Sequence, residues 1–136
     1  MDYIFRLTYG CDLRQGIEQF CQRQNITSAV IVTTVGCLYE ASLRLADGES
    51  TADLKDNYEI VSLTGTVSAD GAHLHISLAD RQGKVIGGHM RYGCLVNTTA
   101  EVALRSLDDR YRLSRQFDET TGYDELVITD LKEVCK

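Results

Sequence analysis

All three histidines of this 136-residue chain lie in one short stretch, GAHLHISLADRQGKVIGGH, which spans residues 71–89. A single residue separates His73 from His75, and His89 follows after a segment with the residue types of a turn. Imidazole nitrogens are preferred ligands of zinc and similar divalent ions, and catalytic zinc sites use three protein ligands and leave a fourth position open. A metal site of this kind requires the fold to bring the three rings together.

The same stretch predicts a β-hairpin that places the three rings on one face. Residues 81–83 (RQG) suit a three-residue loop, with glycine at the position that needs a positive φ. The resulting register sets His75 opposite His89 and leaves His73 on the same face. The other face collects the apolar residues Leu74, Ile76, Leu78, Ile86 and Met90. A slip of one residue would mix the two faces, so the pattern disfavours it.

Neighbouring positions on one sheet face lie about 5–7 Å apart, a workable span for a single metal ion. Gly87 and Gly88 leave space beside His89 for a ligand or for another backbone. The fourth ligand has three candidates, and the sequence does not choose among them: Glu101, Asp70 and Cys37. The pattern His-x-His is a weak signal alone. The alternative, three partly exposed histidines on a polar face or at a subunit interface, stays open.

The surrounding sequence predicts one α+β domain over residues 1–136, mainly antiparallel strands with one principal helix. Asp12 has the character of a helix N-cap. Apolar residues then recur at helical spacing, as Leu13, Ile17, Phe20 and Cys21. The strands are expected near residues 1–10, 28–36, 37–46, 58–68, 94–107, 110–117 and 124–129, in addition to the hairpin. The strand over 28–36 is expected to be buried on both faces and to end at its glycine, and polar residues 47–57 are expected to form a loop.

Glu59 is the second residue with chemical interest, because simple alternation puts it on the same side as Val61 and Leu63. An acid among apolar neighbours is either paired or functional. Arg44 is the expected partner in a structural ion pair, and a role of Glu59 as ligand or acid–base residue is the alternative. Gly65, in the same segment, predicts close packing or a β-bulge.

Charge and composition exclude several classes of protein. The net charge of −6 argues against a protein that grips nucleic acid through phosphates. The chain has no proline, so it contains no Arg-Gly-Arg-Pro AT-hook. Its five cysteines include no Cys-x-x-Cys pair, which argues against a zinc ribbon or a disulfide framework. No apolar run approaches the roughly 18 residues of a membrane span, and the first ten residues do not resemble a signal peptide, so a cytoplasmic protein is expected.

Five segments, taken in order, carry a resemblance to a known family. They are GCDLRQGIEQFCQRQNITSAVI, VGCLYEASLRLA, NYEIVSLTGTVS, HLHISLADRQGKVIGGHM and DETTGYDELVI. The third contains Glu-Ile-x-Ser-Leu-x-Gly, a hallmark of the PPC (plants and prokaryotes conserved) domain. The chain resembles a stand-alone prokaryotic member of that family, related to the C-terminal domain of plant AT-hook nuclear-localised proteins.

The resemblance implies a compact homotrimer and a metal at the matching histidines, here His73, His75 and His89. In the plant proteins the Glu-Ile segment is implicated in binding partners, while the separate AT-hook holds DNA. The resemblance establishes no reaction. We therefore expect a trimeric, regulatory binding or interaction module with a three-histidine metal or small-ligand site, zinc or another divalent transition metal, and a protein partner. The alternatives are a DNA-associated regulatory protein and a metal-dependent enzyme, for which the sequence offers no clear nucleophile or base.

Overall fold

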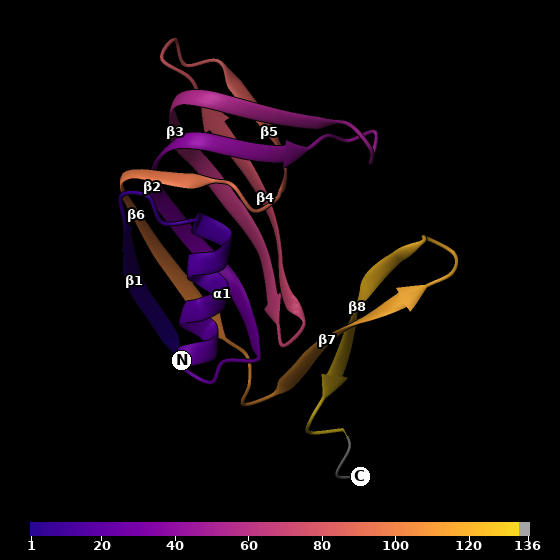
Figure 1. Ribbon diagram of the computed structural model, residues 1–136. Coiled ribbons are helices and arrows are strands. Elements are labelled where there is room, and N and C mark those ends of the chain that lie inside the picture. The colour runs from indigo at the N-terminus through magenta and orange to yellow at the C-terminus, as the bar shows by residue number, and fades with distance from the viewer. Residues whose placement is uncertain (134–136) are drawn as a thin grey trace.

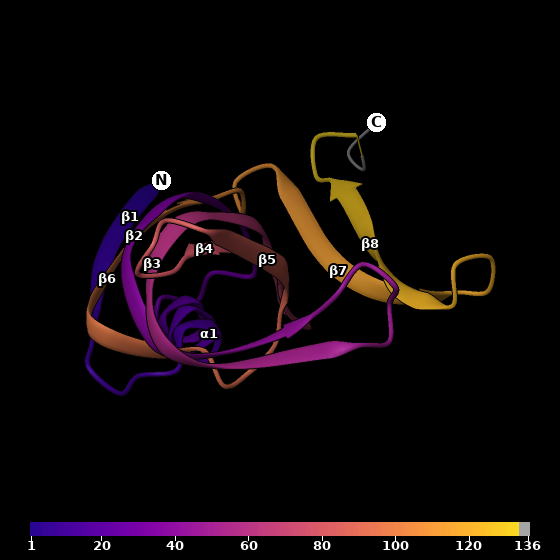
Figure 2. The same ribbon diagram turned by 90° about the horizontal axis from the view of Figure 1, so that it is seen from above.

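A strongly curved antiparallel sheet wraps around one helix in the computed structural model, which describes residues 1–133 (Figure 1). The elements in chain order are β1 (Asp2–Thr8), α1 (Leu13–Arg23), β2 (Ser28–Arg44), β3 (Thr51–Ser68), β4 (Gly71–Ala79), β5 (Val85–Met90), β6 (Leu95–Ser106), β7 (Tyr111–Asp118) and β8 (Tyr123–Asp130). Six strands form one sheet in the order β1-β6-β2-β3-β4-β5, and β2 also pairs with β5. This additional pairing closes part of the sheet on itself, as the view from above shows (Figure 2). The expected α+β class is confirmed.

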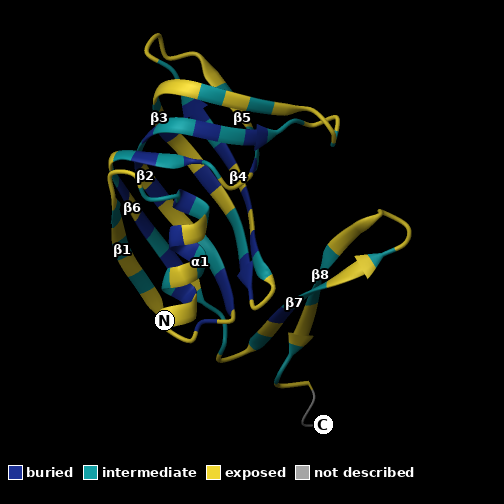
Figure 3. Ribbon diagram, in the orientation of Figure 1, coloured by how far each residue is buried: buried dark blue, intermediate teal, exposed yellow. Residues whose placement is uncertain are grey.

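The core lies between α1 and the inner face of the curved sheet. Asp12 caps the helix by accepting a hydrogen bond from the backbone N–H of Gln15 at 2.9 Å. The inward side chains of the helix, Leu13, Ile17 and Cys21, are buried against alternate residues of the strands. Buried and exposed residues alternate along most strands, which gives the banded pattern of Figure 3.

Strands β2 and β3 are longer than expected from the sequence. Strand β2 continues past Gly36, and β3 begins at Thr51, so most of the polar segment 47–57 is strand and not loop. These residues pair with the second half of β2 as an antiparallel ribbon, and the polar side chains of its β3 strand are exposed. Nor is the early part of β2 buried on both faces, because Val32 and Val35 are more than half exposed.

The expected ion pair between Arg44 and Glu59 is wrong. Glu59 lies opposite Cys37 on β2, whereas Arg44 lies opposite Thr51, far along the same pair of strands. The register shifts between Ile60 and Ser62 of β3, and this β-bulge changes the face on which the following residues lie. Glu59 and Val61 are exposed while Leu63 is buried, so simple alternation failed between Val61 and Leu63.

Strands β7 and β8 form a separate two-stranded sheet that stands away from the main body in both views (Figures 1 and 2). We call this pair the C-terminal arm, residues 111–130. Phe117, Tyr123 and Ile128 of the arm are each at least half exposed. No helix within residues 1–133 has both the length and the apolar character needed to cross a membrane.

Candidate metal centre

The β4–β5 hairpin brings the three histidines together as its pattern predicts. His75 pairs directly with His89, and the register continues through Ile76–Gly88 to the turn. The ring centroids are 5.1 Å apart for His73 and His75, 5.2 Å for His73 and His89, and 5.7 Å for His75 and His89. One ring nitrogen from each histidine lies within 4.8 Å of the other two. A single ion can therefore be reached by all three rings.

The hairpin turn and the core fix this register from two sides. Gly83 has φ +80°, which the three-residue loop requires. The Asp80 carboxylate accepts the backbone N–H groups of Gln82 and Lys84, each at 2.9 Å. On the opposite face, four of the five apolar residues are buried and Ile86 is half-buried. A shift in register would expose this apolar face, so the packing of the apolar residues fixes the positions of the imidazoles on the other face.

Two glycines allow the neighbouring strands to approach the hairpin. Gly65 of β3 has φ +149°, and a Cβ there would overlap the carbonyl oxygen of His73. A Cβ on Gly88 would lie 2.6 Å from the carbonyl oxygen of Arg44. Gly65 therefore serves close packing, as one of its two expected roles, and the space at Gly88 admits another backbone. At Gly87 the same test places a Cβ 2.7 Å from a carbonyl oxygen of β4.

The close approach at Gly88 gives the site a residue that the sequence did not predict there. Strand β2 pairs with β5 so that Arg44 lies directly opposite His89, on the same face of the sheet. The guanidinium of Arg44 lies 5.5 Å from the ring centroid of Tyr123 on β8. The glycine pair in β5 was the only sequence signal for this crossing, and it did not identify which strand would cross.

Burial and nearby positive charge keep two rings of the cluster, His73 and His89, in their neutral, ligating form. Burial lowers the pKa of His89 to about 4, and Arg44 and His73 act in the same direction. The pKa of His73 is lowered as well, mainly by burial and then by Arg115, while Glu125 of β8 acts in the opposite direction. Neutral imidazole is the form that binds a metal ion, so these two rings are ready to do so at neutral pH.

The donor set fits a divalent transition metal. The Nδ1 atom of His89 is buried and has no hydrogen-bond partner. An unpaired buried polar atom costs free energy of folding unless a ligand such as a metal ion pairs with it. Three neutral imidazoles suit zinc, copper, nickel or iron better than calcium or magnesium, which prefer oxygen ligands. A zinc ion held by His73, His75 and His89 would act as a Lewis acid or lower the pKa of a bound water.

None of the three candidates for a fourth ligand joins the cluster. Glu101 of β6 lies opposite Val35 of β2. The Cys37 thiol donates to the carbonyl oxygen of Asn97 at 2.8 Å. The Asp70 carboxylate accepts the backbone N–H of Arg115 at 2.8 Å. Within residues 1–133, the group that can share an ion consists of the three histidines alone.

Comparisons with known proteins relate this chain to one domain family. The sequence model of the Plants and Prokaryotes Conserved domain family, abbreviated PCC or PPC, matches residues 1–108. The bifunctional protein GlmU of Synechococcus sp. (strain JA-3-3Ab) is 46% identical over 132 residues, which are 96% of this chain and 21% of that protein. The chain thus spans about a fifth of the length of the two GlmU relatives that it matches. The AT-hook motif nuclear-localized protein 16 of Arabidopsis thaliana is 30% identical over 97 residues, 67% of this chain and 37% of that protein.

Solved structures carry the same fold. A hypothetical protein from Salmonella cholerae-suis has a TM-score of 0.91 and 36% identity, with 96% of this chain and 94% of that chain covered. A metal-containing protein from Archaeoglobus fulgidus has a TM-score of 0.79 and 29% identity, with 93% of each chain covered.

Proposed function

Because this chain belongs to the Plants and Prokaryotes Conserved domain family, we propose that it is a cytoplasmic, homotrimeric binding module with a regulatory role. Its histidines His73, His75 and His89 hold a divalent transition metal, and zinc is the first candidate. The observation that carries this proposal is the convergence of three ring nitrogens within 4.8 Å of one another. The metal-containing relative from Archaeoglobus fulgidus supports it.

The homotrimer and the protein partner rest on the family and on two exposed features. An isolated two-stranded sheet is marginally stable in water, and the C-terminal arm makes few contacts with the main body. Its exposed Phe117, Tyr123 and Ile128 would be covered by a neighbouring subunit. A protein partner would find both Glu59 and Val61 exposed on β3, within the family's hallmark segment.

DNA association is the weaker alternative. The net charge of −6 opposes the phosphate backbone, and the chain has no AT-hook. The arginines in and just before the C-terminal arm are Arg105, Arg110, Arg112 and Arg115. They are partly neutralised, since Arg105 pairs with Asp2 at 2.7 Å and Arg110 pairs with Asp130 at 3.1 Å. Binding that weakens steeply with salt in a gel-shift assay would be needed to favour this alternative. No observation on the described residues favours a particular reaction for a metal-dependent enzyme.

The experiment that tests the metal site is metal content by plasma mass spectrometry. It compares tag-free wild-type protein with His75→Ala and with Gln82→Ala, a control in the exposed turn of the same hairpin. We expect close to one transition-metal ion per chain in wild type and control, and a small fraction of that in His75→Ala. Wild-type protein that stays metal-free after incubation with excess zinc and dialysis would overturn the proposal.

A further inference from the structure

A small cavity adjoins the histidine cluster at the C-terminal end of β5. Its volume is about 310 Å³, and its walls are Arg14, Arg44, His89, Arg91 and Tyr92. Three of these five residues are arginines, and His89 belongs to the cluster as well. The cavity is therefore strongly basic in a protein whose net charge is −6.

Arg44 is the residue whose charge is least compensated. Its Nε atom is buried and has no hydrogen-bond partner. No carboxylate within residues 1–133 lies at ion-pair distance from its guanidinium, which lies over the Tyr123 ring. A permanently charged group without an ion-pair partner is costly in a partly buried position, so the guanidinium of Arg44 is suited to an acceptor from outside the chain.

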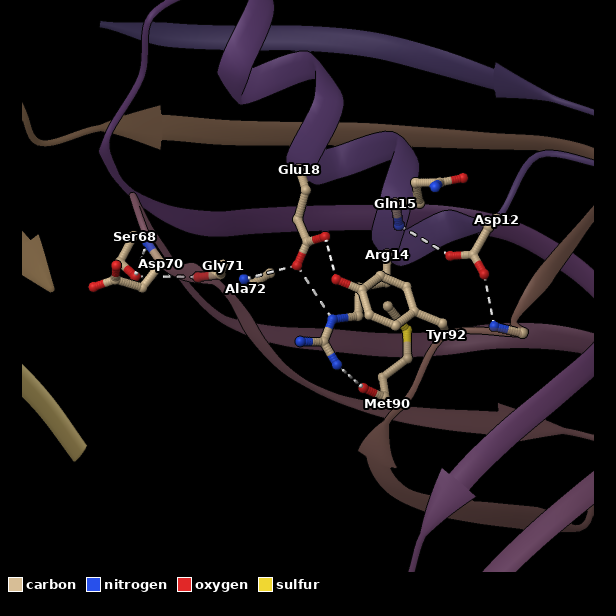
Figure 4. Close-up of polar contacts among 11 residues, drawn as sticks. Asp12, Arg14, Gln15, Glu18, Ser68, Asp70, Gly71, Ala72, Met90 and Tyr92 are labelled. Atoms are coloured by element: carbon tan, nitrogen blue, oxygen red, sulfur yellow. Dashed lines mark hydrogen bonds and ion pairs between the residues drawn. The ribbon is translucent and has the colours of Figure 1, made fainter. Parts of the chain in front are cut away.

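Arg14 is held in place by a network of contacts with Glu18, Tyr92 and Met90. Its role in the cavity wall is therefore structural. Glu18 accepts from Nε of Arg14 at 3.3 Å and from the Tyr92 hydroxyl at 2.6 Å. The guanidinium of Arg14 lies 4.4 Å from the centroid of the Tyr92 ring and donates to the carbonyl oxygen of Met90 at 3.3 Å. Figure 4 shows how Glu18 joins the two side chains. The network makes this wall rigid and neutralises the charge of Arg14.

Arg91 keeps more of its charge available. It donates to the Ser42 hydroxyl at 3.3 Å, and that hydroxyl in turn donates to the Asp53 carboxylate at 2.7 Å. The acid therefore lies one residue removed from the guanidinium. Together with Arg44, Arg91 leaves an excess of positive charge facing the cavity.

We propose that this cavity binds the carboxylate or phosphate group of a small metabolite, with Arg44 and Arg91 as its charged ligands. The planar guanidinium presents paired N–H donors that match the two oxygens of a carboxylate or phosphate. A cavity of about 310 Å³ is at the lower end of small-molecule sites, so the ligand is a small acid and not a nucleotide or a polymer. This inference deepens the proposed function, because the anion and the metal would share His89 and bind side by side.

The test is isothermal titration with two probes, malonate for carboxylates and inorganic phosphate for phosphates. Each is titrated into metal-free and zinc-loaded protein, for wild type, Arg44→Gln and Arg112→Gln. Arg112 is an exposed arginine of β7 that does not line the cavity, so its variant controls for the loss of one charge. Circular dichroism and zinc content show whether Arg44→Gln keeps its fold and its metal site.

We expect at least one probe to bind wild type, and its Kd to rise by about 10-fold or more in Arg44→Gln and by less than about 2-fold in Arg112→Gln. The probe that binds more tightly identifies the anion class. Equal affinity in the two variants, or no binding of either probe by zinc-loaded and metal-free wild type, would overturn the inference. Binding that depends on Arg44 in a protein that takes up no zinc would refute the metal proposal and uphold this one. Zinc uptake without anion binding would uphold the metal proposal and refute the anion site.

Discussion

At the scale of single residues, the rings of the histidine cluster are positioned by side chains on the other face of the sheet. The register of β4 and β5 depends on a buried apolar face and a tight turn, so a histidine can be replaced without disturbing what positions the other two. Substitution of one histidine should therefore affect metal binding without changing the fold of the hairpin.

The first residue-scale prediction concerns metal affinity. We expect His89→Gln to weaken zinc binding by on the order of 100-fold or more, because loss of even a residue that supports a ligand costs roughly 10–100-fold. Competition with a chelating dye measures the change. Gln82→Ala is the control and should bind zinc as wild type does. A His89→Gln protein with wild-type affinity would show that this ring is not a ligand.

The second concerns pH. The pKa of His89 is lowered to about 4 in the folded chain, against an ordinary value of 6.5. Between these values the unfolded chain binds a proton that the folded chain does not, so the stability of metal-free protein falls as pH drops from about 6.5 towards 4. We expect the thermal midpoint to fall less steeply over this range in His89→Gln. Parallel curves for the two metal-free proteins would contradict the assignment.

At the scale of elements, the close contact between β3 and β4 depends on one missing side chain. We expect Gly65→Ala to destabilise the protein by about 2–4 kcal/mol, because it combines an unfavourable φ with overlap against the His73 carbonyl. Denaturant unfolding measures this loss. The matched control is Gly122→Ala, where φ is +78° but nothing lies within 4 Å, and where we expect about 1 kcal/mol. Equal losses would mean that only backbone conformation matters at Gly65.

Elements also show what the sequence could and could not predict. Helix α1 and the β4–β5 hairpin were predicted with their registers because cap, turn residues and alternation are local signals. The extents of β2 and β3 were not predicted, because bulges break the alternation of these strands and the polar sequence at the start of β3 resembles a loop. For the same reason Glu59 was paired with the wrong partner. Arg44 reaches His89 only through the closure of β2 onto β5, a long-range pairing for which the glycine pair of β5 was the only signal and did not identify the partner strand.

At the scale of the whole molecule, the C-terminal arm is the feature that a single chain leaves without cover. We expect three chains of 15.2 kDa to sediment together at about 46 kDa. Replacing Phe117 and Ile128 together by serine should shift the protein towards smaller species, because it removes exposed apolar surface from the arm. Analytical ultracentrifugation measures the shift.

The control for that measurement is Ile4→Ser, which changes an isoleucine of β1 that is 80% exposed and lies outside the arm. It should leave the sedimentation unchanged. A wild-type protein that sediments as a single chain would contradict the homotrimer, and dissociation of the control to the same extent would contradict the role of the arm.

The closure of β2 onto β5 also has a consequence for the order in which a newly made chain acquires its parts. His73, His75 and His89 belong to one hairpin, and hairpins form within about 1–10 μs. Arg44 joins them only after a large loop has been closed, which is slower because the entropy of closure must be met before its contacts form. An ion captured by the early hairpin would hold its two strands together before β2 has paired with β5. Metal supplied during refolding should therefore speed the process, whereas an anion that requires Arg44 should not.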